Sequence, residues 1–407
     1  MAAGALAGWL YPGVAPFAEP VARSFLRLIQ SVIAPVLVTT LVASFARGGR
    51  LSDLGRVGLK SLAWFEGSTT FALLLGWAMM SWFRPGDGVG LQGSVSAAVP
   101  PDFGRVVENM FPSSVFDAMA RGDVLQLVLF SIALGVSCAA AGAKAEPLVR
   151  FCESVSAVAF QYTRYVMHLA AIGVSAAVAA TVARSGIDVL VALGRFVLLA
   201  WATQALFLLL GVLLPLILFR VNTGDFWRHA REPFLIAFGT TSSAAALPSA
   251  MGRMQHFGLP KPLLGLTLPL GLSFNLCGST IHLVMATFFV AQAANVPLTL
   301  GQQLMILLTL KLTSKGVAGI PRANFVILTS LFPAYALPLE GLAALLGIDA
   351  AIDPVRTGVN VLANCAGPVA IARWEGWRPG VPTPPDTPAA GVAPATAAYA
   401  AKDGPPS

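Results

Sequence analysis

The chain has 407 residues, of which 56% are hydrophobic and 11% are charged, and its net charge is +7. Ordinary soluble domains carry about 25% charged residues, so this composition excludes a soluble globular protein and indicates an integral membrane protein. The basic residues flank apolar segments instead of gathering in an exposed patch, which excludes a nucleic-acid-binding protein. In chain order, apolar runs predict a partial helix over residues 1–10 and full helices over 21–46, 59–83, 124–141, 147–184 and 189–220.

These runs are far longer than the strands of a membrane barrel, which have about 10 residues, so we expect a bundle of helices in a lipid bilayer. The first apolar stretch is too short to span a membrane and lacks the basic start of a signal peptide, so we expect a first helix that has lost some of its turns. The final residues, 379–407, are rich in Pro, Ala, Gly and Thr, which predicts a disordered tail.

Three clusters of basic residues predict how the helices cross the membrane. They are Arg47, Arg50, Arg56 and Lys60; Arg220, Arg228 and Arg231; and Arg373 and Arg378. Basic residues next to membrane helices favour the cytoplasmic side, so all three clusters and the C-terminus are expected there. The Gly/Pro-rich loop over residues 84–112 is then expected outside, because successive loops alternate between the two sides.

Two apolar segments in the second half of the chain are interrupted by small polar residues, Gly and Pro. The segment over residues 234–251 is broken at 239–243, and the segment over 303–332 is broken at 314–321. Paired interruptions of this kind are typical of inverted-repeat transporters, because non-helical backbone is tolerated at membrane depth only where it lines a cavity or packs in protein.

A third break, SFNLCGS at residues 273–279, interrupts the long apolar run over 263–294. Such a break frees backbone carbonyl groups that can ligate a cation, and it exposes a helix N-terminus that favours an anion. A contact between small residues of packed helices is the alternative interpretation.

The segment over residues 339–372 predicts a last helix that carries polar residues on one face. They recur every three or four positions and form what we call the polar stripe: Asp349, Asp353, Arg356, Asn360 and Asn364. Two aspartates and one arginine facing lipid would cost roughly 8–10 kcal/mol, so the stripe must face protein or a water-filled cavity. It indicates a site for a charged solute or, alternatively, a structural ion pair between Asp353 and Arg356.

Sequence motifs of enzymes and metal centres are absent. The chain contains no HExxH, no GxSxG and no paired catalytic carboxylates, so we expect no enzymatic activity. The four cysteines lack the spacing of metal ligands and are expected to be buried free thiols: Cys138, Cys152, Cys277 and Cys365. We therefore expect no metal site and no cofactor.

Four ordered motifs resemble the dicarboxylate/amino acid:cation symporter family, the bacterial and archaeal relatives of the excitatory glutamate transporters. The motifs are TTSSAAALP (240–248), SFNLCGST (273–280), TSKGVAGIP (313–321) and GIDAAIDPVRTGVNVLAN (347–364). The resemblance implies an all-α integral membrane protein, an elevator-type transporter with inverted repeats and eight transmembrane helices. It further implies two re-entrant hairpins with tips near Ser243 and Gly319, and a homotrimer in the inner membrane of a bacterium.

The resemblance also divides the chain into a scaffold, which carries the trimer contacts, and a transport domain, which moves across the membrane. Residues 1–58 are expected to be scaffold helices, and residues 84–186 an external loop followed by further scaffold helices. The third helix, 59–83, and residues 187–378 are expected to form the transport domain, and residues 379–407 the cytoplasmic tail.

Position by position, the resemblance implies a substrate site at the polar stripe. Arg356 is expected to pair with the side-chain carboxylate of an acidic substrate, and Asp353 with its ammonium group. The other expected contacts are Thr357, Asn360, Ser243, Ser279 and Gly319. A guanidinium fork beside a carboxylate suits glutamate or aspartate, whereas a plain dicarboxylate leaves Asp353 without a cationic partner.

The cation-binding positions that the resemblance implies are Asp349, Asn275, Asn364, Cys277, Ser68 and Thr69. The chain departs from the family at two of them, because Cys277 and Asn364 replace carboxylates. Losing one carboxylate about 4 Å from a cation removes roughly 4 kcal/mol of attraction at an effective dielectric constant of 20. We therefore expect coupling to protons, with sodium as the alternative ion. Arg322, beside the second hairpin tip, is a further departure.

Two residues are candidate proton carriers, because a carboxyl or imidazole group within a membrane marks a proton path by default. Glu66 lies inside the apolar third helix, and His282 lies three residues after Ser279. The alternatives are a Glu66 that snorkels or pairs with another helix, and a His282 that is hydrogen-bonded in the core.

Together these features predict a symporter that imports acidic amino acids or related dicarboxylates across the cytoplasmic membrane. A substrate-gated anion channel and a sensor that does not transport are the alternatives on the same fold. The missing cation carboxylates favour the alternatives, whereas the intact Arg356, Asp353 and Asn360 favour the symporter. The expected partners are the lipid bilayer, the small acidic substrate and further copies of the chain.

Overall fold

The computed structural model describes residues 2–47, 55–91, 112–186, 188–316 and 323–377, and the regular elements in these ranges are all helices. The first half contains α1 (Ala2–Leu10), α2 (Ala15–Arg47), α3 (Gly55–Phe83), α5 (Val115–Arg121), α6 (Val124–Ala141), α7 (Glu146–His168) and α8 (Ala170–Ser185). The second half contains α9 (Asp188–Phe207), α10 (Leu214–Leu218), α11 (Thr223–Thr240), α12 (Ser243–His256), α13 (Lys261–Phe274), α14 (Cys277–Ala293), α15 (Leu300–Thr313), α16 (Ala323–Ala334) and α17 (Glu340–Trp374). Short helical turns join some of them: η1 (Pro12–Val14), η3 (Gly142–Ala145), η4 (Leu208–Leu213) and η5 (Ser314–Gly316).

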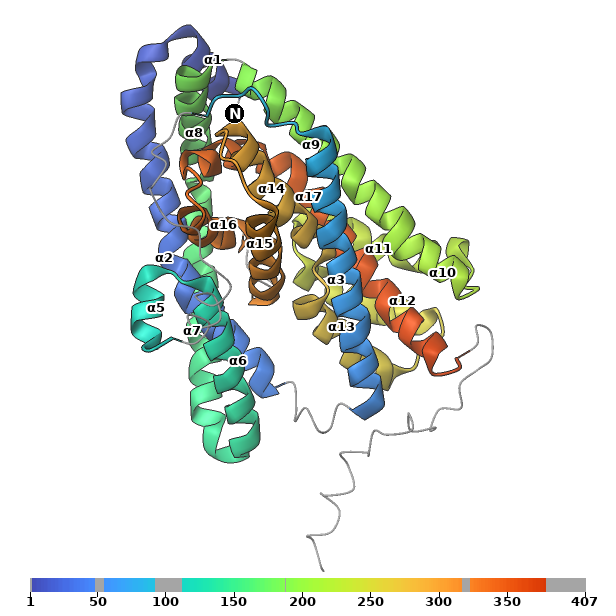
Figure 1. Cartoon of the computed structure of the whole chain (residues 1–407). Helices are drawn as coiled ribbons and strands as arrows, with labels where there is room; N and C mark the ends of the chain where they lie inside the picture. The colour runs from blue at the N-terminus through green and yellow to red at the C-terminus, as the bar shows by residue number, and fades with distance from the viewer. Residues whose placement is uncertain (1, 48–54, 92–111, 187, 317–322, 378–407) are drawn as a thin grey trace, which may run out of the picture.

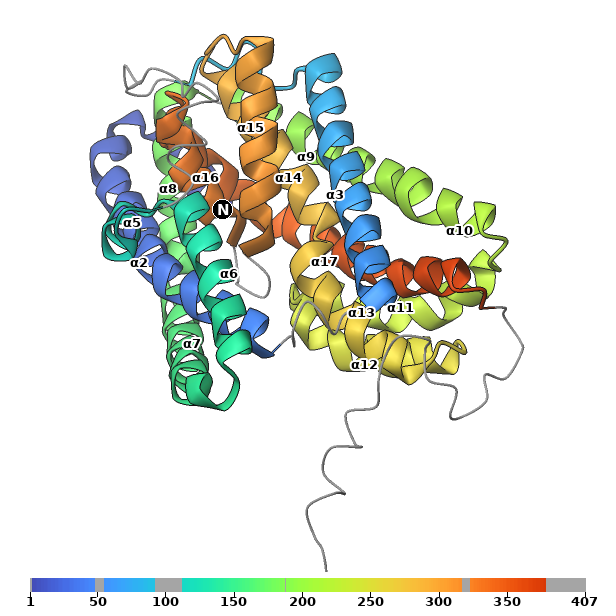
Figure 2. The same ribbon diagram turned by 60° about the horizontal axis from the view of Figure 1, so that its bottom comes forward.

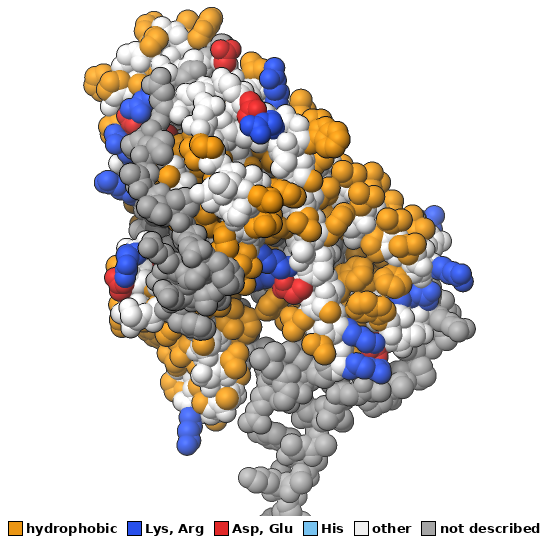
Figure 3. Space-filling view, in the orientation of Figure 1, with side chains coloured by type: hydrophobic (Ala, Val, Ile, Leu, Met, Phe, Trp, Pro, Cys, Tyr) orange, Lys and Arg blue, Asp and Glu red, His pale blue; other side chains and the backbone are white. Residues whose placement is uncertain are grey.

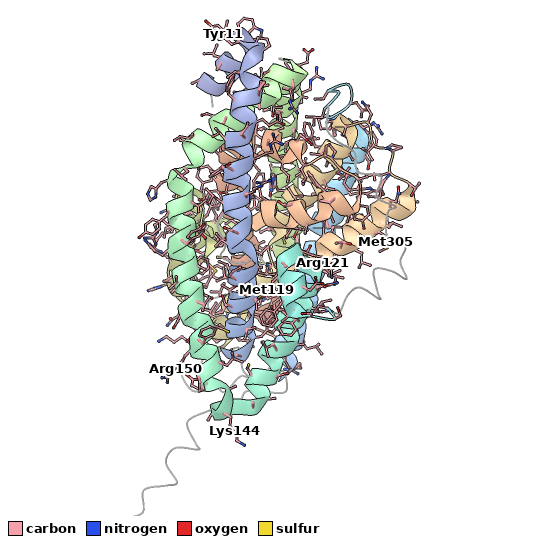
Figure 4. The ribbon with its side chains drawn as sticks, turned by 90° about the vertical axis from the view of Figure 1, so that its left-hand side faces the viewer. Tyr11, Met119, Arg121, Lys144, Arg150 and Met305 are labelled. Carbon is pink, nitrogen blue, oxygen red and sulfur yellow. The ribbon has the colours of Figure 1, made fainter. Side chains whose placement is uncertain are left out.

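The helices form two groups (Figure 1). In the first group, α2 packs against α6, α7 and α8, and α1 packs against α8. Figure 4 shows this group from the side, with Tyr11 at one end and Lys144, in the turn between α6 and α7, at the other. In the second group, α17 packs against α9 and α11 to α14, and α3 packs against α13, α14 and α17 (Figure 2). Helix α17 also contacts α8 and so joins the two groups.

Helices α14 and α17 form the core of the second group. Nearly all side chains of α14 and most side chains of α17 are buried. Helix α14 is apolar on nearly all sides, and a helix of that composition is stable only where neighbouring helices surround it. Four residues of the polar stripe on α17 are buried and so lie inside the protein: Asp349, Arg356, Asn360 and Asn364.

Two of the predicted breaks lie where the sequence places them. Helix α11 ends before Thr241, which has a left-handed backbone with φ of 50°, and Ser242 caps α12 by accepting a hydrogen bond from the Ala245 N–H at 3.3 Å. Helices α13 and α14 are separated at Asn275 and Leu276. For the remaining break, α15 continues into η5, and residues 317–322 lie outside the described residues.

Two helices that we predicted as continuous are irregular. The helix over 147–184 has a turn at Leu169, where the Leu169 N–H bonds the Val166 carbonyl three residues back and so tightens the chain. The helix over 189–220 contains the π-helical η4 just before Pro215, which has no N–H to donate to the preceding turn. The short helix α5 was not predicted, although Ser114 before it and the left-handed Gly122 after it are ordinary boundary residues.

Basic residues from two of the predicted cytoplasmic clusters meet at one end of the molecule, next to Phe219, which directly precedes Arg220 of the third cluster. Arg56 and Lys60 of α3 form salt bridges with Glu375, which follows α17, and the Lys60 Nζ–Glu375 Oε1 distance is 2.6 Å. Arg373 donates a hydrogen bond to the carbonyl oxygen of Phe219 after α10, at 2.9 Å. The charges at this end agree with a common cytoplasmic side.

Three helical stretches among the described residues have the length and apolar composition to cross a membrane: Leu125–Val166, Asp188–Leu218 and Lys261–Ala293. Figure 3 shows one face of the molecule, where hydrophobic side chains cover much of the visible surface and most charged side chains lie near the rim. All four cysteines are buried free thiols, as expected. The architecture is that of an all-α membrane protein.

Candidate functional site

Arg356 lies at the centre of the polar stripe and contacts two of its carboxylates. Its Nη1 is 3.0 Å from Asp349 Oδ1, and its Nη2 is 2.8 Å from Asp353 Oδ1. The Arg356 side chain is 4% exposed and that of Asp349 is 1% exposed, whereas Asp353 is 17% exposed. The Thr357 hydroxyl also lies 3.3 Å from Asp353 Oδ1. The ion pair that the sequence raised as an alternative is therefore present, and Asp349, predicted for a cation, takes part in it.

Asn360 joins α17 to the first turn of α14. Its Oδ1 accepts a hydrogen bond from the Ser279 N–H at 3.2 Å, and its Nδ2 donates to Ser279 Oγ at 3.0 Å. Asn324 of α16 donates to the Ser279 carbonyl at 3.3 Å. The structure thus brings together two predicted substrate residues from segments far apart in the chain.

The close approach of α14 and α17 at this point depends on Gly278. A Cβ atom on Gly278 would lie 2.3 Å from the carbonyl oxygen of Arg356, which no real Cβ contact reaches. The Gly278 carbonyl accepts a hydrogen bond from Gln204 Nε2 at 2.9 Å. Gln204, fully buried on α9, was missed by the sequence analysis, although a single Gln in an apolar run is a usable signal.

Three predicted cation residues meet at the break between α13 and α14. The Cys277 thiol donates to Asn275 Oδ1 at 3.1 Å and also shares a hydrogen bond with Ser68 of α3. Asn275 Nδ2 in turn donates to the Ala363 carbonyl of α17 at 3.0 Å. Thr69, next to Ser68, contacts lysines of α15 and η5.

Asn364 packs against α13. Its Nδ2 donates to the Leu268 carbonyl at 3.1 Å, while its Oδ1 has no hydrogen-bond partner within the described ranges. That oxygen lies where a Cβ of Gly271 would be, only 1.6 Å from the ideal Cβ position, so Gly271 makes room for it. Asn364 is buried but is held mainly by contacts with α13.

The two candidate proton carriers have different surroundings. Glu66 forms salt bridges with Lys311 at 2.8 Å and Lys315 at 2.6 Å, which agrees with the alternative of pairing with another helix. The contact with Lys311 was not predicted from the sequence. His282 is fully buried, with its ring 6.3 Å from the Phe196 ring, and neither ring nitrogen has a hydrogen-bond partner in the part of the chain that is described.

The hairpin-tip residues are only partly described. Ser243 is the first residue of α12, which packs against both α11 and α17. Gly319 and Arg322 lie outside the described residues.

Comparisons with known proteins agree with this architecture. Residues 1–374 match the model of the sodium:dicarboxylate symporter family. A C4-dicarboxylate transport protein of Anaeromyxobacter sp. (strain K) is 39% identical over 387 residues, which cover 92% of this chain and 87% of the relative. The proton/glutamate-aspartate symporter of Bacillus subtilis (strain 168) is 36% identical, over 92% of this chain and 93% of the relative. The proton/sodium-glutamate symport protein of Geobacillus stearothermophilus is 34% identical, over 90% of this chain and 89% of the relative.

The family match spans most of the chain, and the related proteins are aligned over nearly their whole lengths. They are transport proteins and not enzymes. The chain belongs to the sodium:dicarboxylate symporter family and is a membrane transport protein.

Proposed function

We propose that the protein is a symporter that imports acidic amino acids, glutamate or aspartate, or related dicarboxylates across the cytoplasmic membrane. The observation that carries the proposal is the buried guanidinium of Arg356 between two carboxylates. A buried charge needs partners, and the only cation of the polar stripe is matched by two anions. The Arg356 guanidinium can therefore exchange one protein carboxylate for a substrate carboxylate and still remain paired with an anion.

The neighbouring residues support an amino acid as substrate. If a substrate carboxylate takes the Arg356 fork, Asp353 is released to face a cation, and the α-ammonium group of an amino acid supplies one. Asp353 is also the more exposed of the two aspartates, so it is the one that a ligand reaches. Thr357, Asn360, Ser279, Ser243 and Gly319 are the proposed further contacts.

The names of the related proteins support both substrate classes. The Bacillus subtilis relative is named for glutamate and aspartate, and the Anaeromyxobacter relative for C4-dicarboxylates. Asp353 favours the amino acids, because a dicarboxylate brings no positive charge to it. A substrate-gated anion channel or a sensor remains the second function on this fold.

We further propose proton coupling with reduced sodium dependence. Cys277 and Asn364 supply no negative charge at two expected cation positions, and Asp349 is paired with Arg356. Glu66 and His282 are the proposed proton carriers. The Bacillus subtilis relative is named for protons and the Geobacillus stearothermophilus relative for protons and sodium, which agrees with either ion in this family.

The proposed architecture follows the family. Eight transmembrane helices and two re-entrant hairpins, α11–α12 and α15–α16, form an elevator-type protein that assembles as a homotrimer. Residues 1–58 and 84–186 are the proposed scaffold, and 59–83 with 187–378 the moving transport domain. The proposed location is the bacterial inner membrane, with the C-terminal residues 379–407 in the cytoplasm.

Equilibrium binding to the purified full-length protein tests the proposed substrate class. Titration calorimetry with glutamate, aspartate and succinate, and with leucine and lysine as controls, compares ligands that differ in charge. We expect saturable binding of the acidic ligands, with glutamate or aspartate tighter than succinate, and no binding of leucine or lysine. Binding of the neutral or basic amino acid in preference to all acidic ligands would contradict the proposal.

A further inference from the structure

Two lysines fill the space between α3, α13 and α15. Lys311 lies in the last turn of α15 and Lys315 in η5. Helix α15 packs against α3, and η5 packs against α13 just before the break at Asn275. The side chains of Lys311 and Lys315 are only 18% and 11% exposed, so both charges are held inside the protein.

The ammonium group of Lys315 has an acceptor for each of its three N–H donors. Its Nζ lies 2.6 Å from Glu66 Oε1, 3.1 Å from the carbonyl oxygen of Phe274 and 3.3 Å from Thr69 Oγ1. The Phe274 carbonyl belongs to the last residue of α13, where a helix leaves its carbonyl groups without helical partners. Lys315 thus binds a carbonyl group at the C-terminal end of α13, which the break leaves without a helical partner.

Lys311 binds the same part of α3. Its Nζ lies 2.8 Å from Glu66 Oε2, 2.7 Å from the Glu66 carbonyl oxygen, 2.9 Å from Thr69 Oγ1 and 2.6 Å from Thr70 Oγ1. The two ammonium groups therefore share the Glu66 carboxylate and the Thr69 hydroxyl. Every oxygen in this set is a carboxylate, carbonyl or hydroxyl oxygen, the type that coordinates sodium at broken helices.

We propose that Lys311 and Lys315 are built-in cations: their ammonium groups take the oxygen ligands that a sodium ion would need between α3 and the α13–α14 break, so no sodium ion binds there. A lysine ammonium is a compact point charge with three donors, which suits it to this position. The inference rests on the proposed cation coupling and deepens it, because it assigns one cation position permanently to the protein.

The charge balance supports exclusion of sodium. Two ammonium groups face one carboxylate, so the cluster already has one positive charge in excess. At an effective dielectric constant of about 20, one uncompensated charge about 4 Å away weakens cation binding by roughly 1,000-fold. Removing both lysines would leave Glu66 negative beside the Thr69 hydroxyl and the Phe274 carbonyl, which is an attractive site for sodium.

Thermal unfolding of the purified full chain in detergent tests the proposal without any substrate, so the result is independent of the substrate class. Sodium chloride is titrated against choline chloride at constant ionic strength. The test variant is Lys311→Met with Lys315→Met, which removes both charges and keeps unbranched side chains only one heavy atom shorter. Lys144→Met, at an exposed turn, is the matched control. A ligand that binds only the folded state raises the unfolding midpoint in a saturable way.

We expect no sodium-specific shift of the unfolding midpoint from this site in the wild type or in Lys144→Met. In the double variant we expect a saturable rise of the midpoint. The sodium affinity of the double variant should be at least about 100-fold above that of the wild type. A double variant that unfolds cooperatively but responds to sodium as the wild type does would overturn the proposal. A sodium-dependent rise of the midpoint in the wild type that Thr69→Val abolishes would also overturn the proposal. This comparison of the wild type with Thr69→Val tests the proposal if the double variant fails to fold.

Discussion

Arg356 is an almost fully buried cation whose fork is divided between Asp349 and Asp353. Arg356→Ala would remove the shared partner of two carboxylates, and leaving buried charges unpaired costs about 3–5 kcal/mol of stability. Arg356→Lys is the sharper variant, because it keeps the charge and loses the planar bidentate fork.

We predict that Arg356→Lys stays folded and binds glutamate at least about 10-fold more weakly, a loss of about 1.4 kcal/mol. Titration calorimetry measures the affinity, and thermal unfolding verifies the fold. Arg195→Ala, on an exposed position of α9, is the control and should bind normally. Unchanged affinity in Arg356→Lys would show that the substrate does not use the fork.

Asp353→Asn keeps the shape of the side chain and removes its charge, while Arg356 retains its contact with Asp349. An ammonium group near Asp353 would lose a charge-assisted hydrogen bond, which contributes about 1.5–3 kcal/mol. We therefore predict a loss of affinity for glutamate that exceeds the loss for succinate by about 10-fold or more. Competition binding with both ligands provides the comparison, and equal losses would assign Asp353 a structural role.

The polar stripe could be predicted from the sequence, because helical spacing and the cost of placing a charge in a membrane can both be evaluated from the residues of a single helix. It could not be predicted that Asp349 also pairs with Arg356, because Asp349 lies seven residues before Arg356, about two helical turns away, and the contact depends on how both side chains extend along the helix. Gln204 and Lys311 were missed for a different reason: their partners lie on other helices, at Gly278 and Glu66. Only the packing of helices shows such pairs.

At the scale of elements, the contact of α14 with α17 is set by a backbone approach that excludes a side chain at Gly278. We predict that Gly278→Ala destabilises the protein by about 1–3 kcal/mol, the usual cost of overpacking, and weakens substrate binding because the Arg356 backbone must move. Gly265→Ala on α13, where an added Cβ has no neighbour within 4 Å, is the control and should be neutral or stabilising. Chemical denaturation of both variants measures their free energies of unfolding. Similar values for Gly278→Ala and Gly265→Ala would contradict a close backbone approach at Gly278.

The breaks at Thr241 and at Asn275 could be predicted because small polar residues interrupt apolar runs there. The turn at Leu169 and the π-helical η4 could not, because no cluster of small polar residues marks either one: those near Leu169 are scattered along the run, and η4 contains only Gly211 before Pro215. Hydrophobic composition indicates that a segment is buried or in lipid, but the exact path of its backbone depends on neighbouring helices.

At the scale of the whole molecule, α3 and α17 are tied together at one end by Glu375 with Arg56 and Lys60. Burial alone would raise the pKa of Glu375, but hydrogen bonds and attraction from Lys60 and Arg56 together lower it. A lowered pKa in the folded state means that this contribution is present above the ordinary value of about 4.3 and is lost as the pH falls through the folded-state value.

We predict that Glu375→Gln lowers stability slightly at neutral pH, by up to about 1 kcal/mol for a partly exposed pair. The difference from the wild type should vanish in acid, where the wild-type carboxylate is protonated. Unfolding measured from pH 7 to below pH 4 provides the comparison, and Glu146→Gln, in the exposed pair with Arg150, is the control. A difference that persists unchanged in acid would exclude the ion pairs as its cause.

The central claim is that the protein accumulates an acidic solute through the Arg356 site at the expense of a cation gradient. The most direct measurement is uptake of labelled glutamate into proteoliposomes, with inward proton and sodium gradients imposed separately and with Arg356→Lys in parallel. We predict accumulation that follows the proton gradient, continues when choline replaces sodium, weakens in Glu66→Gln or His282→Gln, and is strongly reduced in Arg356→Lys. Accumulation that requires sodium and ignores the proton gradient would contradict proton coupling, and uptake by Arg356→Lys equal to that of the wild type would contradict the site.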